Sequence, residues 1–545
     1  MRKDDRERAL SELNRRVIGG VLQQAESGGQ SLEEVLAESV FYERARLRFD
    51  LTSPTRDHDM QFWNRAASRL GKAGDRELRG LVYDVVGHYG REICGRFDDR
   101  IYGMASKMVP PALGLLLNAT SPKRLLGRRP QLPDFDSVVA LLGETEAVQR
   151  LNDRGTLLFV PTHVSNLDSV VLGFALQRLG LPPALYGAGI NLFTNPLLGF
   201  FLRNLGAYRV DRLKKDPLYK NVLKAYATLA LEYGYNGLFF PGGTRSRAGA
   251  VENKLKLGLM GTGLSAYINN LRSGKRLPNV YVVPVSVSFQ LVLEAETLID
   301  DFLRDVGKSR YIISDDEFAK PRRVFDFLSQ LLSLNADVAV TFGEPRDVFG
   351  NRVDDDGNSL DPCGRHVDTT RYVTYQGDVC ARPQRDAEYT RELGERVVES
   401  LRRHTVLHST HVLARAVFDG LRHEIPGVDA IRLVRVGARD VRLDLRDVYW
   451  HMRKLLDALR ASAHAGHVRL SRVVQYASAE DVVADGLRYF SIYHARPAVE
   501  RRGDVLVPTD RALLFYYQNR LEGYGLERMA MRAIPSMTDD VRRVA

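Results

Sequence analysis

The chain has 545 residues, which is too long for one ordinary hydrophobic core and favours two or three domains. Hydrophobic residues make up 44% and charged residues 27%, a composition that excludes a mostly disordered chain. The net charge of +10 favours anionic partners. Zinc-finger spacings and basic helices rich in aromatic residues are absent from the sequence, so an acidic membrane surface is favoured over nucleic acid.

The N-terminus and the cysteines favour a reducing cytoplasm. Residues 1–10 are charged throughout and lack the apolar stretch of a signal peptide. The three cysteines, Cys94, Cys363 and Cys380, are too few and too widely spaced for a disulfide framework or a zinc site. Cys94 falls within a helical pattern, so we expect it in a hydrophobic core.

The first predicted elements are helices. Ser31 and Glu34 have the spacing of a capping box ahead of a helix with one apolar face, and residues 78–89 show a second helical pattern. We therefore predict a helical N-terminal region over residues 1–130. Near its end, a basic cluster adjoins the apolar residues 113–117, and either a solvated face or a membrane anchor would explain it. The cluster consists of Lys123, Arg124, Arg128 and Arg129.

From about residue 134, short apolar runs alternate with helical segments. The predicted strands are residues 156–160, 237–240, 280–287 and 337–342. The predicted helices between them are residues 165–179, 216–233 and 255–271. This alternation favours an α/β domain, which we place at residues 131–350.

Three further segments complete the predicted organisation. The uncharged residues 179–202 contain too many prolines and glycines for a membrane-spanning helix. We predict a loop and a short helix there, at a membrane surface or along a tunnel. Residues 351–385 are polar and are predicted to be a linker or surface loop, and residues 386–545 a mostly helical C-terminal region.

The segment that follows the strand at 156–160 is the histidine loop, residues 161–168. Ser165 is expected to cap the next helix, which places Asp168 at the third helical position, where free amides and the helix dipole stabilise a carboxylate. From there Asp168 can reach the ring of His163, fix its tautomer and stabilise its charged form. His163 would then be a general base, and Asp168 would hold its ring in position. The same spacing also occurs in plain strand-to-helix turns.

Two basic segments follow other strand-like runs. We call residues 206–212 the arginine segment, which continues into Lys214 and Lys215, and residues 240–247 the glycine turn. The two segments contain Arg209, Arg212, Arg245 and Arg247. Guanidinium groups match phosphate oxygens, and glycine amides can approach an anion closely. Together with the histidine loop, these segments indicate chemistry on a phosphorylated substrate.

These segments occur in the order of the four sequence blocks of the glycerolipid acyltransferase superfamily, which the chain resembles. The corresponding blocks are residues 163–168, 206–212, 240–247 and 283–286. Residues 151–345 most resemble the branch of bacterial glycerol-3-phosphate acyltransferases and dihydroxyacetone-phosphate acyltransferases, and the rest of the chain resembles it more loosely. The resemblance implies an α/β fold, with a mixed-sheet acyltransferase domain between helical N-terminal and C-terminal regions.

The resemblance also implies a reaction. A fatty acyl group would pass from acyl-CoA or acyl-carrier protein to the hydroxyl of glycerol 3-phosphate, with His163 as general base and Asp168 as its orienter. Gly243 would also help to stabilise the oxyanion. Substrate binding would fall to Arg209, Arg212, Gly243, Thr244, Arg245, Ser246 and Arg247. No metal or cofactor is required, and the enzyme would lie in the cytoplasm, peripheral on the inner face of the cell membrane, without nucleic acid as a partner.

Two departures from the superfamily leave alternatives open. Gly242 stands where the superfamily usually has glutamate, and Asp211 before Arg212 resembles the lysophosphatidate acyltransferases. The acceptor could therefore be lysophosphatidate or dihydroxyacetone phosphate, or the protein could be a catalytically weakened lipid-binding homologue, although the intact His163 and Asp168 argue against the last. Three histidines on one helical face lack a carboxylate or cysteine partner, so we predict no metal site there. They are His404, His408 and His411.

Overall fold

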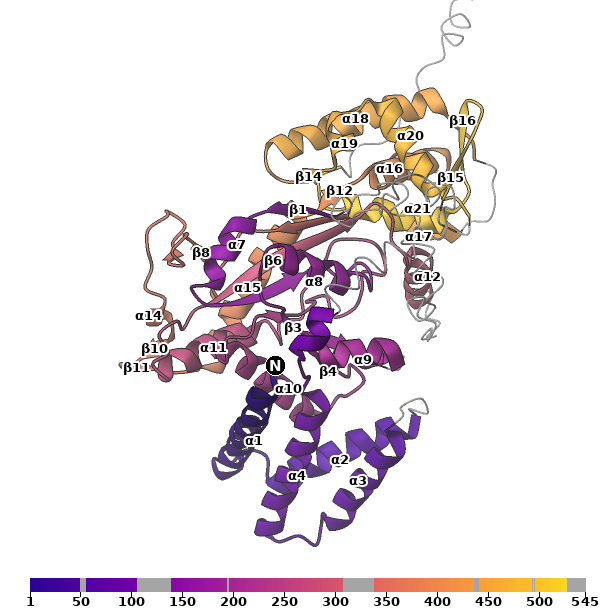
Figure 1. Cartoon of the computed structure of the whole chain (residues 1–545). Helices are drawn as coiled ribbons and strands as arrows, with labels where there is room; N and C mark the ends of the chain where they lie inside the picture. Colours follow the sequence, from indigo (N-terminus) through magenta and orange to yellow (C-terminus); the bar gives the residue numbers. More distant parts are fainter. Residues whose placement is uncertain are drawn as a thin grey trace, which may run out of the picture.

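A computed structural model describes residues 1–49, 55–104, 139–193, 196–306, 338–435, 441–492, 494 and 496–526. The N-terminal helices lie at one end, a sheet with its covering helices lies in the middle, and a second largely helical region lies at the other end (Figure 1). The predicted boundary at residue 130 and the basic cluster at 123–129 lie outside the described residues.

The N-terminal region is a helical bundle, formed by α1 Lys3–Glu26, α2 Leu32–Phe49, α3 Arg56–Arg69 and α4 Asp75–Ile93. The capping box at the start of α2 is confirmed, because Ser31 Oγ accepts from the Glu34 amide at 3.2 Å and the Ser31 amide donates to Glu34 Oε2 at 2.8 Å. The bundle shares one apolar core with helix α10, Pro217–Glu232, and Cys94 is buried in that core as expected.

The central sheet has seven strands in the order β1-β7-β6-β2-β5-β3-β4. They are β1 Val139–Gly143, β2 Thr156–Pro161, β3 Leu185–Gly189, β4 Ala207–Val210, β5 Gly237–Leu238, β6 Val280–Phe289 and β7 Val338–Phe342. All neighbours are parallel except β6 and β7, which confirms the mixed α/β sheet. The prediction of only a loop and short helix at 179–202 was wrong, because β3 lies there ahead of η2 Ile190–Phe193 and α9 Pro196–Asn204.

Helices cover both faces of the sheet because the side chains of β2 alternate between two apolar cores. Leu157 and Phe159 belong to the core that contains residues of α8, Asp168–Arg178. Leu158 and Val160 belong to the core built with α11, Gly261–Arg272, and α15, Pro383–His404. The sheet also carries α7 Thr145–Asn152 and α12 Ala295–Val306. This two-sided burial accounts for the continuous apolar runs that predict the strands.

Beyond the sheet, residues 351–385 contain short regular elements. These are β8 Arg352–Val353, β9 Ser359–Leu360, α14 Thr370–Val373, β10 Thr374–Tyr375 and β11 Asp378–Val379. The predicted boundary at 385 falls inside α15, which packs against β6. The remaining elements are α16 Ser409–Glu424, α17 Ala430–Arg435, α18 Leu445–His464, α19 Arg472–Tyr476, α20 Ala479–Phe490, α21 Arg511–Gln518, η4 Asn519–Leu521, β12 Val406–Leu407, β13 Leu443–Asp444, β14 Arg469–Leu470, β15 Val499–Arg502 and β16 Val505–Pro508.

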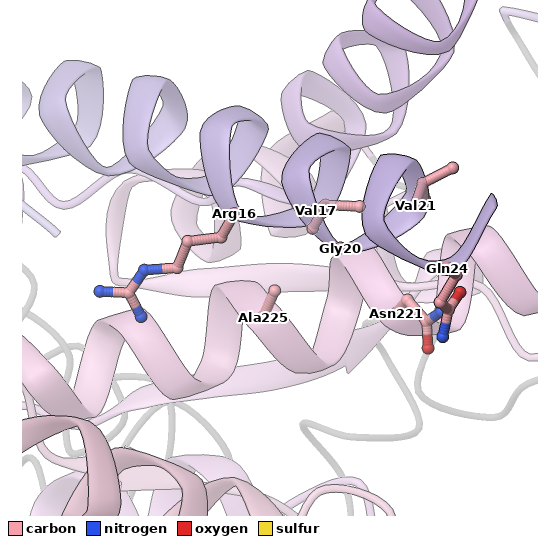
Figure 2. A pocket seen from close by; sticks show the side chains of 7 residues that line it. All are labelled: Arg16, Val17, Gly20, Val21, Gln24, Asn221 and Ala225. Carbon is pink, nitrogen blue, oxygen red and sulfur yellow. The ribbon is translucent and has the colours of Figure 1, made fainter. Parts of the chain in front are cut away.

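The N-terminal bundle is joined to the sheet domain through α1 and α10. Arg16 of α1 donates two hydrogen bonds to Glu232 of α10, each 2.7 Å long. Beside this pair, a cavity of about 210 Å³ lies between the two helices and is lined by both (Figure 2). Among the helices that the structure describes, none is both long and apolar enough to cross a bilayer.

Candidate active site

The candidate site lies at one edge of the sheet because the strands that precede it run in the same direction. β2 pairs in parallel with β5 and β6, and β3 joins β5 to β4 in parallel. The histidine loop follows β2, the arginine segment contains β4 and the two residues after it, and the glycine turn follows β5. Segments after the carboxyl ends of parallel strands meet at one edge, which is the usual place for ligand binding in open α/β sheets.

Asp168 holds the histidine loop from inside. Its Oδ2 accepts hydrogen bonds from His163 Nδ1 at 2.9 Å, from the Val164 amide at 2.7 Å and from the Ser165 amide at 3.0 Å. The Asp168 side chain is fully buried. The predicted helix start at Ser165 was wrong, since α8 begins at Asp168 and the loop wraps around its carboxylate. Ser165 Oγ instead accepts from the Leu167 amide at 3.2 Å, ahead of the first helical turn.

The orientation of His163 leaves one ring nitrogen available. A carboxylate only accepts hydrogen bonds, so the proton lies on Nδ1 and the neutral ring presents Nε2 as an acceptor. No described residue hydrogen-bonds to Nε2, and 11% of the side chain is exposed. The ring stacks on Phe240 of the glycine turn, with 4.0 Å between the centroids. This arrangement suits a base that takes a proton from a molecule at the surface.

The glycine turn is fastened to the histidine loop through backbone contacts. The Ser246 amide donates to the His163 carbonyl at 2.7 Å, and the His163 amide donates to Glu252 Oε1 at 2.7 Å. Gly243 has a φ of +76°, which favours glycine there. Its amide donates to the Phe240 carbonyl at 3.1 Å, so the geometry does not support the predicted oxyanion contact of this amide.

A buried glutamate ties Arg245 to the histidine loop. Glu294 follows β6 and is fully buried; it accepts from Ser165 Oγ at 2.8 Å, from the Asn166 amide at 3.0 Å and from Arg245 Nη1 at 3.1 Å. Burial raises the pKa of Glu294, and the charge of Arg245 opposes that shift. Glu294 was not predicted from the sequence, although its position just beyond a strand parallel to β2 was a signal for it.

The four predicted phosphate-binding arginines have different surroundings. Arg212 has no carboxylate partner among the described residues, and its side chain reaches solvent although the surrounding protein removes part of its hydration. That desolvation and then the charge of Arg245 lower its pKa. Arg209 lies over the ring of Phe193, 5.2 Å from its centroid, and desolvation lowers its pKa. Arg247 pairs with Asp305 of α12. The positive charge of Arg245 therefore acts on Arg212, while the other two arginines have partners of their own.

The remaining predicted residues of the glycine turn contribute less to an open binding surface. Ser246 Oγ donates to the Ala250 carbonyl at 2.6 Å, so both the hydroxyl and the amide of Ser246 stabilise the loop. Thr244 is exposed. Lys256, which was not predicted from the sequence, crosses the turn so closely that a Cβ at Gly243 would lie 2.6 Å from Lys256 Nζ. Its exposed ammonium adds a positive charge to the turn.

Lys214, two positions after Arg212, packs against the N-terminal helices and not at the candidate site. Lys214 is buried and its Nζ lies 2.6 Å from Glu92 Oε2 and 3.3 Å from Glu43 Oε2. Asp211 is buried beside Arg46, at 3.5 Å. These contacts bind the end of the arginine segment to helices α2 and α4, so Lys214 is a structural ion-pair partner.

The three histidines near α16 are buried without acidic ligands. His404 Nδ1 lies 2.8 Å from the Ser400 carbonyl, and the His408 amide donates to His411 Nδ1 at 3.1 Å. Burial lowers the pKa of His408 to about 3 and also lowers the pKa of His404 and His411. In the described part of the chain, no group of three or more potential ligands is arranged to hold a metal ion.

Comparison with known proteins identifies the class of the central domain. Residues 144–288 match the family named Acyltransferase, and this span contains β2 to β5, most of β6 and the three segments that form the candidate site. The chain therefore contains an acyltransferase domain.

The chain is also similar to particular curated proteins. The chain is 30% identical over 278 residues to a glycerol-3-phosphate acyltransferase of Pseudomonas fluorescens Pf-5, a match that covers 51% of this chain and 30% of that protein. It is 33% identical over 201 residues to a glycerol-3-phosphate acyltransferase of Ectopseudomonas mendocina, covering 37% of this chain and 22% of the relative. The match thus spans less than a third of either relative's own length.

Proposed function

We propose that the protein transfers a fatty acyl group to the hydroxyl of glycerol 3-phosphate and so forms lysophosphatidate. The observation that carries the proposal is the His163–Asp168 pair, with Nε2 of His163 left without a partner among the described residues. Relatives named glycerol-3-phosphate acyltransferase support the choice of acceptor. The positive charges of Arg212 and Arg245, which act on one another, favour an acceptor with a phosphate group.

In the proposed reaction, His163 Nε2 takes the proton of the glycerol hydroxyl while its oxygen attacks the thioester carbonyl carbon. Asp168 stabilises the imidazolium that forms and holds the ring in place through Nδ1. The tetrahedral intermediate then collapses, the carbon–sulfur bond breaks, and the departing thiolate takes the proton back from His163. The ester oxygen stays on the glycerol, and no metal or additional cofactor enters these steps. The donor is acyl-CoA or acyl-carrier protein.

We further propose that the protein binds the anionic inner face of the cell membrane peripherally. Phe200 and Leu213 expose 43% and 60% of their surface on either side of the arginine segment. Arg203 and Lys215, two or three positions from them in sequence, are also exposed. Exposed apolar side chains beside cations suit an interface that combines shallow insertion with attraction to acidic lipids. Flotation with anionic vesicles tests this: the wild type should float, and Leu213→Ser should float less.

The test of the reaction is an acyl-transfer assay with palmitoyl-CoA and, separately, an acyl-carrier-protein donor. Glycerol 3-phosphate, dihydroxyacetone phosphate and lysophosphatidate are offered to the wild type, to His163→Ala and to His464→Ala, which alters an exposed histidine far along the chain. We expect turnover of glycerol 3-phosphate to fall by roughly 10²–10⁴-fold in His163→Ala and to persist in His464→Ala.

Other outcomes of this assay would revise the proposal in defined ways. Turnover with lysophosphatidate alone would identify lysophosphatidate as the acceptor, the alternative that the sequence Asp211-Arg212 favours. Turnover with dihydroxyacetone phosphate alone would keep the base and change the acceptor. Absence of turnover with every donor and acceptor would reject the enzyme and leave a lipid-binding homologue.

A further inference from the structure

The space above Gly242 is occupied by a side chain from further along the chain. A Cβ built on Gly242 would lie 3.1 Å from Cγ of Glu252 and 3.5 Å from its Oε1. The backbone of Gly242 does not have a positive φ, so the conformation itself would admit a side chain. The room that a residue at 242 would use is therefore filled by Glu252.

The carboxylate of Glu252 joins the glycine turn to the histidine loop. Its Oε1 accepts the His163 amide at 2.7 Å, across 89 positions of sequence. Its Oε2 is enclosed and has no hydrogen-bond partner in the described part of the chain. Burial raises the pKa of Glu252, while the His163 amide, Arg520 and His163 itself oppose the shift. An acid held inside a site with spare bonding capacity is a common feature of functional centres.

The backbone of His163 is thereby held from both sides. Glu252 holds the His163 amide, and the Ser246 amide holds the His163 carbonyl at 2.7 Å. Glu252 and Ser246 both belong to the chain that follows β5, and Phe240 of the same turn stacks on the His163 ring. A displacement of this turn would move the backbone and the ring of His163 together.

We propose that Glu252 is a positioning residue that supplies the carboxylate absent from position 242. It would fix the backbone of His163 and place a negative charge beside the ring when the ring becomes positively charged. The glutamate of the superfamily block is then relocated by ten positions in this chain rather than lost. This inference rests on the proposed acyl transfer.

The test is a swap of the carboxylate between the two positions. Glu252→Ala removes it, Gly242→Glu adds a second one in the same space, and the double variant Gly242→Glu/Glu252→Ala returns a single carboxylate. A hydrogen bond to a charged group is worth about 1.5–3 kcal/mol, so we expect kcat to fall roughly 10–150-fold in Glu252→Ala. Gly242→Glu should lower kcat as well. The double variant should recover most of the wild-type kcat.

Conservative and control variants separate positioning from stability. Glu252→Gln keeps an acceptor for the His163 amide but removes the charge; we expect a lower kcat, an almost unchanged KM for the acceptor, and an acid limb of the pH–kcat/KM profile that moves to lower pH. Asn253→Ala alters an exposed neighbour and should behave like the wild type. Circular dichroism and thermal unfolding identify any variant that fails to fold, and Glu252→Gln is then the deciding variant.

The outcomes distinguish this inference from the proposed function. An inactive wild type, with every donor and acceptor, would reject the acyl transfer itself. An active wild type matched by Glu252→Gln in kcat and pH profile would overturn the role of Glu252 alone. A folded double variant no more active than Glu252→Ala would show that positions 242 and 252 are not equivalent, which would also overturn it.

Discussion

Arg212 and Lys214 stand close together in one basic stretch of sequence but belong to regions with opposite electrostatic arrangements. Lys214 is 2% exposed and meets Glu43 and Glu92, while Arg46 beside it meets Glu43 and Asp211. Arg212 is exposed and has another arginine, Arg245, as its electrostatic neighbour. The first region satisfies its charges internally and holds helices together; the second leaves positive charge available to an anion.

The largest effect should follow from breaking the internally paired region. Lys214→Ala leaves Glu43 and Glu92 without their buried ammonium, so we expect the free energy of unfolding to fall by about 3–5 kcal/mol in urea titrations. Burial already raises the pKa of Glu43, and loss of Lys214 would raise it further. When the folded-state pKa of a carboxyl group lies above its unfolded value, the folded state loses stability as the pH rises. The destabilisation caused by Lys214→Ala should therefore grow from pH 5 to pH 8.

Lys215→Ala is the matched control for this prediction. Lys215 is exposed beside the buried lysine, and its removal should change the free energy of unfolding by no more than about 0.5 kcal/mol. Equal effects of the two substitutions would contradict the distinction between the regions.

The next effect concerns the anion-facing region. Arg212→Ala should raise the KM for glycerol 3-phosphate roughly 10–150-fold, the equivalent of about 1.5–3 kcal/mol for a charge-assisted contact with phosphate. Since Arg212 has no carboxylate partner among the described residues, the urea midpoint should stay near that of the wild type. A large loss of stability with an unchanged KM would assign Arg212 to the structural class instead.

The third prediction concerns His408, a buried histidine whose charged form is not stabilised by a carboxylate among the described residues. Burial, and then the charge of Arg520, lower the pKa of His408 to about 3, well below the roughly 6.5 of an unfolded chain. Between these two pKa values only the unfolded state binds the proton, so the free energy of unfolding decreases as the pH is lowered. At pH 5 this decrease is about 2 kcal/mol. Replacing His408 with Gln should therefore reduce the loss of unfolding free energy between pH 7 and pH 5. His464→Gln, at an exposed site, should retain that loss.

The smallest effect should come from an arginine that is exposed but already paired. Arg247 lies against Asp305 of α12, with 42% of its side chain exposed. Exposed pairs contribute about 0–1 kcal/mol, so Arg247→Ala should barely change the urea midpoint. Because Asp305 competes with phosphate for the guanidinium, we also expect the KM for glycerol 3-phosphate to rise less than in Arg212→Ala. A larger rise than in Arg212→Ala would reverse the assigned order of these arginines.

These cases show what the sequence could and could not reveal. The strands at β2, β6 and β7 are predictable because both faces are buried and the apolar runs are continuous. β3 is not, since its glycines and half-buried side chains resemble a loop. The residues of the histidine loop carry their own pattern, so the His163–Asp168 contact follows from local spacing. Glu252 and Glu294 reach the same loop from distant segments, and only the fold brings them there.

The basic residues were hardest to assign. Arg212 and Lys214 carry the same charge in the same stretch, and their difference depends on helices α2 and α4, which precede them by more than a hundred positions. The roles of Arg209, Arg212, Arg245 and Arg247 in phosphate binding stay predictions. The contact of Arg245 with Glu294 nevertheless shows that one of them is tied to a buried carboxylate of the histidine loop's surroundings.

The segment after the glycine turn makes contacts with residues that are synthesised much later. Asn519 Nδ2 donates to the Ala248 carbonyl at 2.9 Å across 271 positions, and a Cβ at Gly249 would lie 2.0 Å from the Tyr516 carbonyl oxygen. At ribosomal rates of about 5–20 residues per second, the segment after the glycine turn therefore waits roughly 14–54 s for its partner to be made. A nascent chain would acquire this support only after residue 519 has been made, and ribosome-bound chains arrested before residue 511 should lack the proposed acyl-transfer activity.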